Sequence, residues 1–189
     1  MLKEIQKKKL THYFNILDYN NNGVIQEEDF VAIAENLCVL WGLKEDTEDH
    51  QKWISRFKNQ WAEFRDYTIG AGGTDATIED WLKFADEKLV NGDELYYSLF
   101  IEKMAEDIFD LFDEDKNGYI ELNEFIDFFM AFRIEIRYSA KSFTMLDSNK
   151  DDSISKDELI TGINAFFRSD DENNPGNWLF GFWEGGKQS

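Results

Sequence analysis

The sequence contains few of the residues that many kinds of protein site require. A single cysteine, Cys38, excludes an internal disulfide, and its apolar neighbours in AENLCVLW predict a small buried side chain on a helix. The two histidines, His12 and His50, are interpreted as surface or helix residues. One proline, Pro175, together with apolar residues spaced three or four apart, predicts a mostly helical chain.

Basic residues are also scarce. The chain has 20 Lys and Arg but 39 Asp and Glu, so its net charge is −19. Such a chain repels phosphate, which excludes nucleic acid as a partner and favours cations, divalent metal ions first. No apolar run approaches the ~20 residues of a membrane span, and the charged start MLKEIQKKKL does not resemble a signal peptide. We therefore expect a cytoplasmic protein whose last residues, 184–189, form a flexible end.

Catalytic arrangements are missing as well. No serine has a nearby histidine with a third orienting group. The stretch GAGG at 70–73 lacks the lysine and the strand–helix context of a phosphate-binding loop. We expect a protein that is not an enzyme. The aromatic content of 16% is nevertheless high enough for a substantial core, which excludes a disordered acidic chain.

The segment DEDKNGYIELNEF, residues 113–125, carries the clearest chemical pattern. It matches D-x-[DN]-x-[DN]-G-x5-E from Asp113 to Glu124. Calcium takes six to eight oxygen ligands, and side chains at positions 1, 3, 5, 9 and 12 of such a loop converge while residue 7 offers its carbonyl. The glycine at position 6 supplies a left-handed turn. The predicted ligands are Asp113, Asp115, Asn117, Tyr119, Glu121 and Glu124.

The same pattern occurs twice more, at residues 18–29 and 147–158. The first copy has Asp29 instead of glutamate at position 12. The other copy has Asp152 instead of glycine at position 6. The predicted ligands are Asp18, Asn20, Asn22, Val24, Gln26 and Asp29 in the first copy, and Asp147, Asn149, Asp151, Ser153, Ser155 and Glu158 in the other.

Apolar residues also repeat around the three loops. Position 8 is isoleucine each time, at Ile25, Ile120 and Ile154, which predicts that loops pair through a short two-stranded ribbon. Phenylalanine or leucine stands just before and just after every loop, as expected of helices that pack their apolar faces together. Three matching copies favour metal binding over a merely solvated acidic surface.

These residues carry the signature of the EF-hand family, to which the chain is similar over nearly its whole length. Because EF-hand units pack in pairs, the resemblance implies a fourth unit. Residues 53–67 are predicted to form its entering helix and residues 78–90 its exiting helix. The segment TIGAGGTDAT between them has one acid, Asp75, so we expect a unit that keeps its fold without metal ligands; the alternative is a plain linker.

The layout resembles the sarcoplasmic calcium-binding proteins, calerythrin and calexcitin, whose C-terminal tail is tucked into the protein as 166–183 would be here. The resemblance implies an all-α fold with two pairs of EF-hand units packed into one compact globule, and short two-stranded ribbons between paired loops. The expected domains are 1–92 and 93–183.

The three loops should differ in their affinity for calcium. At its predicted ligand positions loop 113–124 has four acids, loop 147–158 three and loop 18–29 two, so loop 113–124 is expected to bind calcium tightest. Asp29 reaches less far than glutamate and suits magnesium, so loop 18–29 is expected to be the weakest calcium site or to prefer Mg²⁺. Asp152 should weaken loop 147–158 through its left-handed backbone, at a cost of about 1 kcal/mol.

The leading functional hypothesis is a cytosolic calcium buffer or transport protein with three Ca²⁺ sites, present as a monomer. A calcium sensor is the second hypothesis, although the four methionines do not form the cluster that sensors expose to a protein target. A photoprotein-like or luciferin-binding-like protein is the third hypothesis. Photoproteins use several histidines, whereas this chain has two.

Overall fold

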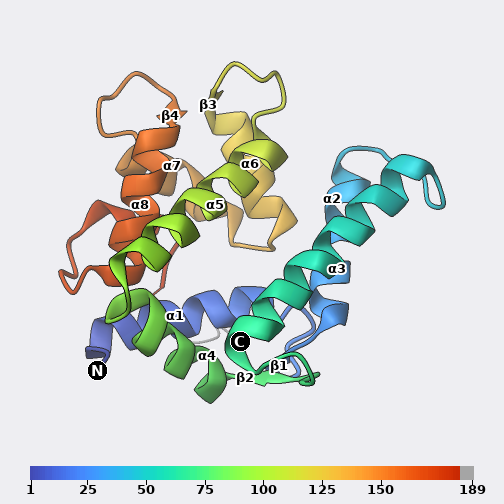
Figure 1. Ribbon diagram of the computed structural model, residues 1–189. Helices are drawn as coiled ribbons and strands as arrows, with labels where there is room; N and C mark the ends of the chain where they lie inside the picture. The colour runs from blue at the N-terminus through green and yellow to red at the C-terminus, as the bar shows by residue number, and fades with distance from the viewer. Residues whose placement is uncertain (184–189) are drawn as a thin grey trace. The chain divides into compact units, whose positions relative to one another are not determined.

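The computed structural model describes residues 1–183, so the flexible end expected at 184–189 lies outside the described residues. Figure 1 shows the elements in order. They are α1 (Glu4–Leu17), β1 (Val24–Ile25), α2 (Glu27–Leu40), α3 (Glu48–Thr68), β2 (Ala76–Thr77), α4 (Ile78–Phe84), the π-helix η1 (Ala85–Val90), α5 (Glu94–Phe112), β3 (Tyr119–Ile120), α6 (Leu122–Ala131), the 3-10 helix η2 (Ile136–Tyr138), α7 (Ser139–Leu146), β4 (Ile154–Ser155), α8 (Lys156–Arg168) and the 3-10 helix η3 (Pro175–Trp178).

The predicted fold class is confirmed: the chain is all-α with two short antiparallel ribbons. It divides into two units. One contains Met1–His12 and the chain from Ala85 onward, and the other contains Tyr13–Phe84. The division at residue 92 expected from the sequence stays a prediction. No helix within residues 1–183 combines the length and the apolar character needed to cross a bilayer.

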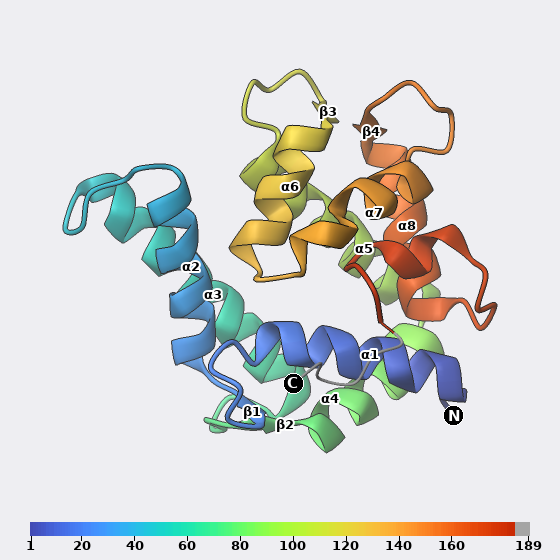
Figure 2. The same cartoon turned by 180° about the vertical axis from the view of Figure 1, so that it is seen from behind.

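Both ribbons join loops through their position 8 residues, as the repeated isoleucines predict. Ile120 pairs with Ile154 between β3 and β4, which lie side by side in Figures 1 and 2. Ile25 pairs with Ala76 between β1 and β2. All four side chains are fully or almost fully buried. Burial of each apolar pair stabilises the contact between the two loops, although each strand has only two residues.

Most of the predicted fourth helix–loop–helix arrangement lies in the unit Tyr13–Phe84, and its last residues, 85–90, belong to the other unit. Its entering helix, α3, begins at Glu48, five residues earlier than predicted, because the Thr47 hydroxyl caps it by accepting the His50 N–H at 3.3 Å. Its exiting segment spans 78–90 as predicted, but residues 85–90 are a π-helix. A stack of rings forms the core, with Phe64 lying 5.8 Å from Trp81 and 6.0 Å from Trp61.

The C-terminal segment packs against α6 and α8, as the resemblance implies. The Phe180 ring lies 4.8 Å from Phe166 and 6.0 Å from Phe128, and Leu179 is fully buried. Its turn is anchored by Lys9 of α1, a completely buried lysine whose Nζ donates to Asn177 Oδ1 at 2.7 Å. The tail is thus part of the core of the unit that contains Met1–His12 and the chain from Ala85 onward.

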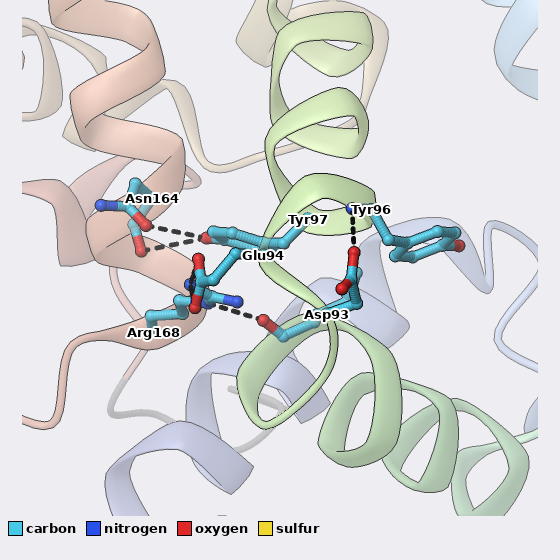
Figure 3. Close-up of polar contacts among 7 residues, drawn as sticks. Asp93, Glu94, Tyr96, Tyr97, Asn164 and Arg168 are labelled. Carbon is cyan, nitrogen blue, oxygen red and sulfur yellow. Dashed lines mark hydrogen bonds and ion pairs between the residues drawn. The ribbon is translucent and has the colours of Figure 1, made fainter.

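A polar cluster links the end of α8 to the start of α5 (Figure 3). The Arg168 guanidinium lies 3.4 Å from the centre of the Tyr97 ring, and its Nε donates to the Leu89 carbonyl at 2.7 Å. Nη1 contacts both carboxylate oxygens of Glu94. The Tyr97 hydroxyl donates in turn to Asn164 Oδ1 at 3.0 Å. The planar guanidinium stacks on a ring and donates several hydrogen bonds at once. It therefore fixes the relative positions of α5, α8 and η1, which a point charge would not do.

Candidate metal centres

The aspartate at position 1 of each predicted loop is held by backbone N–H groups of the turn that follows it. Asn117 donates to Asp113 Oδ1 and Gly118 to Asp113 Oδ2, both at 3.0 Å. Asp18 and Asp147 accept the corresponding bonds in their own loops. The backbone of the loop therefore orients each of these carboxylates.

The side chains at positions 3 and 5 are fixed in the same manner. Asp115 Oδ1 accepts the Asn117 N–H at 3.0 Å, and Asn117 Oδ1 accepts the Tyr119 N–H at 2.8 Å. Equivalent bonds recur in loops 18–29 and 147–158. One hydrogen-bond framework is thus shared by all three loops. The side chains that use it are Asn20, Asn22, Asp115, Asn117, Asn149 and Asp151.

The acid at position 12 joins the two ends of its loop. Glu124 Oε1 accepts the Glu114 N–H and Oε2 accepts the Glu121 N–H, both at 2.9 Å. Glu158 bridges the matching residues of loop 147–158. The carboxylate therefore caps the following helix and closes the loop at the same time.

Asp29 performs the same bridging with a shorter side chain. Its Oδ2 accepts the Gln26 N–H at 2.8 Å, and its Oδ1 accepts the N–H of Asn20 at 3.1 Å. Asn20 is the third residue of the loop, whereas Glu124 reaches the second residue of its own loop. Asp29 is fully buried.

Three carboxylates of loop 113–124 converge. One oxygen of each of Asp113, Asp115 and Glu124 lies within 4.8 Å of the other two. Among residues 1–183, no other three acid, histidine or cysteine side chains meet as closely. Three like charges at this separation repel one another, and a divalent cation among them removes that repulsion. The oxygen-only donor set fits calcium.

The pKa of the position 12 acid shifts in opposite directions in loops 113–124 and 147–158. Burial raises the pKa of Glu124, and the adjacent Glu121 raises it further. Burial alone would also raise the pKa of Glu158, but hydrogen bonds from the Ser155 and Asn149 N–H groups and from the Ser148 and Ser155 hydroxyls lower that pKa to about 2. Glu158 is therefore ionised at any physiological pH, as a metal ligand must be.

Left-handed backbone occurs at position 6 of all three loops, which confirms the expectation for Asp152. Its φ is 65°, against 93° for Gly23 and 85° for Gly118. A second left-handed position is not predictable from the loop pattern. Position 4 also has positive φ in every loop, at Asn21 (59°), Lys116 (57°) and Lys150 (62°).

The fourth loop can be numbered from the ribbon. Because Ala76 pairs with Ile25, it holds position 8, and the loop runs from Ile69 to Asp80. Positions 1, 3 and 5 are then Ile69, Ala71 and Gly73, none of which has a side-chain oxygen. Asp80 still caps α4 by accepting the Thr77 N–H at 3.0 Å. We call residues 69–80 the silent loop.

Comparison with known families identifies two of these loops, 18–29 and 113–124. Residues 104–133 match the model of an EF-hand domain, and residues 1–37 match that of an EF-hand domain pair. The chain is an EF-hand protein. It is similar in sequence to calerythrin, to the photoprotein mitrocomin and to a luciferin-binding protein, and it shares the fold of a sarcoplasmic calcium-binding protein. EF-hands bind calcium, so calcium ions are its partner.

Individual relatives match over most of their length. Calerythrin of Saccharopolyspora erythraea is 21% identical over 171 residues, which cover 88% of this chain and 94% of calerythrin. The crystal structure of the coelenterazine-binding protein from Renilla muelleri matches with a TM-score of 0.75 and 22% identity, covering 95% and 99% of the two chains. The sarcoplasmic calcium-binding protein from amphioxus gives 0.68 and 16%, covering 96% and 99%.

Proposed function

We propose that this EF-hand protein binds three calcium ions, in loops 18–29, 113–124 and 147–158, and acts as a monomeric cytoplasmic calcium buffer or carrier rather than as an enzyme. The convergence of Asp113, Asp115 and Glu124 carries the proposal. The hydrogen-bond framework of that loop recurs in the other two. Mg²⁺ competes for loop 18–29, which has two acids at its predicted ligand positions where loop 113–124 has four.

The packing of the tail supports a buffer over a sensor. A sensor exposes an apolar groove when its EF-hands load, and a target then fills that groove. In this protein the rings of Phe128 on α6 and Phe166 on α8 already contact Phe180 of the tail. Phe180 itself is 3% exposed. The tail therefore already covers apolar rings of α6 and α8 that a target would otherwise contact.

Calcium titration by calorimetry tests the number of sites. We expect three ions for the unmodified protein and two for each of Asp29→Asn, Glu124→Gln and Glu158→Gln, because each change neutralises the carboxylate that closes one loop. Glu102→Gln, an exposed acid of α5, is the matched control and should keep three. A chain that binds no calcium at millimolar concentration would disprove the proposal.

An apolar dye such as ANS separates buffer from sensor. The buffer proposal expects little change in dye fluorescence on passing from magnesium-loaded to calcium-loaded protein. A several-fold increase would favour the sensor, because it would report newly exposed apolar surface.

A second candidate function follows from the relatives. The curated relatives include the luciferin-binding protein of Renilla reniformis, and the coelenterazine-binding protein shares the fold. A small aromatic ligand among the six tryptophans is the corresponding hypothesis. Saturable quenching of tryptophan emission by coelenterazine would support it, and light on adding calcium would support a photoprotein. The buffer proposal expects neither.

A further inference from the structure

The silent loop places an acid against a predicted ligand of the neighbouring loop. The antiparallel register that pairs Ile25 with Ala76 sets Asp75 opposite Gln26, the position 9 residue of loop 18–29. Gln26 Nε2 donates to Asp75 Oδ1 at 2.5 Å. This contact lies within the unit Tyr13–Phe84 and joins the loop with ligands to the loop without them.

A carboxamide side chain at position 9 has only one end that can bind a cation. Its oxygen can face a cation, directly or through water, whereas its NH₂ group cannot. Gln26 Oε1 accepts from Asn22 Nδ2 at 2.9 Å, so this oxygen is turned toward its own loop. Asp75, which can only accept when ionised, holds the NH₂ end on the other side.

We propose that Asp75 is a positioning residue for the ion of loop 18–29, which keeps Gln26 Oε1 turned toward the ligands of that loop. This inference rests on the proposed function, because it assumes that the loop takes an ion. It gives the silent loop a role: the loop contributes no ligand and selects the orientation of one in its partner. Removing an outer partner of a metal ligand typically weakens metal binding 10–100-fold.

Loop 113–124 does not need a partner residue that orients its position 9 side chain. Position 9 of loop 113–124 is Glu121, and both ends of a carboxylate are oxygen. The register of β3 and β4 places Ser153 opposite Glu121. The Ser153 hydroxyl instead donates to Asp151 Oδ1 within its own loop, at 2.8 Å. Across the first ribbon an acid, Asp75, therefore faces the amide at position 9, Gln26. Across the second ribbon Ser153 faces the acid at position 9, Glu121.

Two substitutions separate positioning from charge. We expect Asp75→Ala to weaken the ion of loop 18–29 by about tenfold. Asp75→Asn should weaken it less than about threefold, because an amide oxygen accepts the same hydrogen bond. Equal losses in both variants would overturn the positioning role and leave only a charge effect. Glu79→Ala, which removes an exposed acid from α4, is the control and should change nothing.

A reciprocal change at position 9 removes the group that Asp75 orients. With Gln26→Glu the ligand has no NH₂ group, because both ends of a carboxylate are oxygen. Asp75→Ala in that background should therefore lower the affinity of the loop by less than about threefold, through its charge alone. A loss as large as that expected with Gln26 present would contradict the inference.

The metal-free protein supplies a readout that does not depend on an ion. The side-chain NH₂ protons of Gln26 should shift and exchange faster in Asp75→Ala when followed by NMR, while circular dichroism stays unchanged. If loop 18–29 takes no ion in the unmodified protein, both the proposed function and this inference fail. If it takes an ion whose affinity is the same in Asp75→Ala, only the inference fails.

Discussion

Asp29 is the residue at which loop 18–29 departs most from its counterparts. It closes the loop with both oxygens, but from a side chain one methylene shorter than glutamate. We expect Asp29→Glu to raise the calcium affinity of this loop about tenfold and to lower its preference for magnesium, because bidentate reach suits the larger ion. Calorimetric titration with each ion measures both effects. Unchanged calcium affinity would contradict this account.

Asp152 offers a second test at the scale of one residue. Its φ of 65° is a conformation that glycine adopts without cost. Asp152→Gly should therefore strengthen the ion of loop 147–158 by about fivefold, equivalent to about 1 kcal/mol. The reverse change, Gly118→Asp, should weaken loop 113–124 by a similar factor.

A charge control accompanies this test. Asp152→Asn removes the same charge and retains a side chain at the left-handed position, and NMR titration assigns the change to one loop. If Asp152→Asn gains as much as Asp152→Gly, backbone strain is not the cause.

At the scale of elements, Lys9 connects α1 to the end of α8. Its Nζ donates to the carbonyls of Ala165 and Ser169 at 3.0 and 2.9 Å. Burial lowers the pKa of Lys9 from 10.5 to about 8, and the negative charge of Asp170, itself paired with Lys3, opposes that shift. The unfolded chain thus binds this proton more tightly than the folded chain does.

This shift predicts a pH dependence. Between about pH 8 and pH 10.5 the unfolded state holds more protons, so the free energy of unfolding rises with pH, by at most about 3 kcal/mol. Denaturant unfolding of the calcium-loaded protein across this range, compared with Lys9→Met, isolates the contribution, because other groups titrate alike in both. A difference between the two proteins that stays constant with pH would contradict the assignment.

At the scale of the whole molecule, the negative net charge couples folding to the binding of metal ions. The three proposed calcium ions would add 3 × 2 = 6 positive charges and change the net charge from −19 to −13. An ion at 1,000 times its dissociation constant stabilises the native state by about 4 kcal/mol. We expect the melting temperature to rise by more than about 10 °C between EDTA and calcium, with magnesium in between. Calorimetry measures it, and equal melting temperatures would exclude ion binding linked to folding.

The loops could be predicted from the sequence because their chemistry is local. Twelve consecutive residues contain the predicted ligands, the turn and the helix cap, so spacing alone indicated the loops at 113–124, 18–29 and 147–158. The isoleucine at position 8 likewise predicted both ribbons. Position 4 escaped prediction because Asn21, Lys116 and Lys150 share no side-chain chemistry. The start of α3 was placed too late because an apolar pattern begins only after the cap.

Contacts between distant segments depended on the tertiary structure. Nothing in the sequence marks Lys9 as a fully buried anchor of the tail, because its partners lie more than 150 residues away. Nor does Asp75, a lone acid between glycines and threonine, indicate its partner Gln26 until the ribbon sets the register. Local composition determined which loops have the oxygens that calcium requires. Only the pairing of helices and strands, driven by burial of apolar faces, decided which loop faces which and which side chain orients another's ligand.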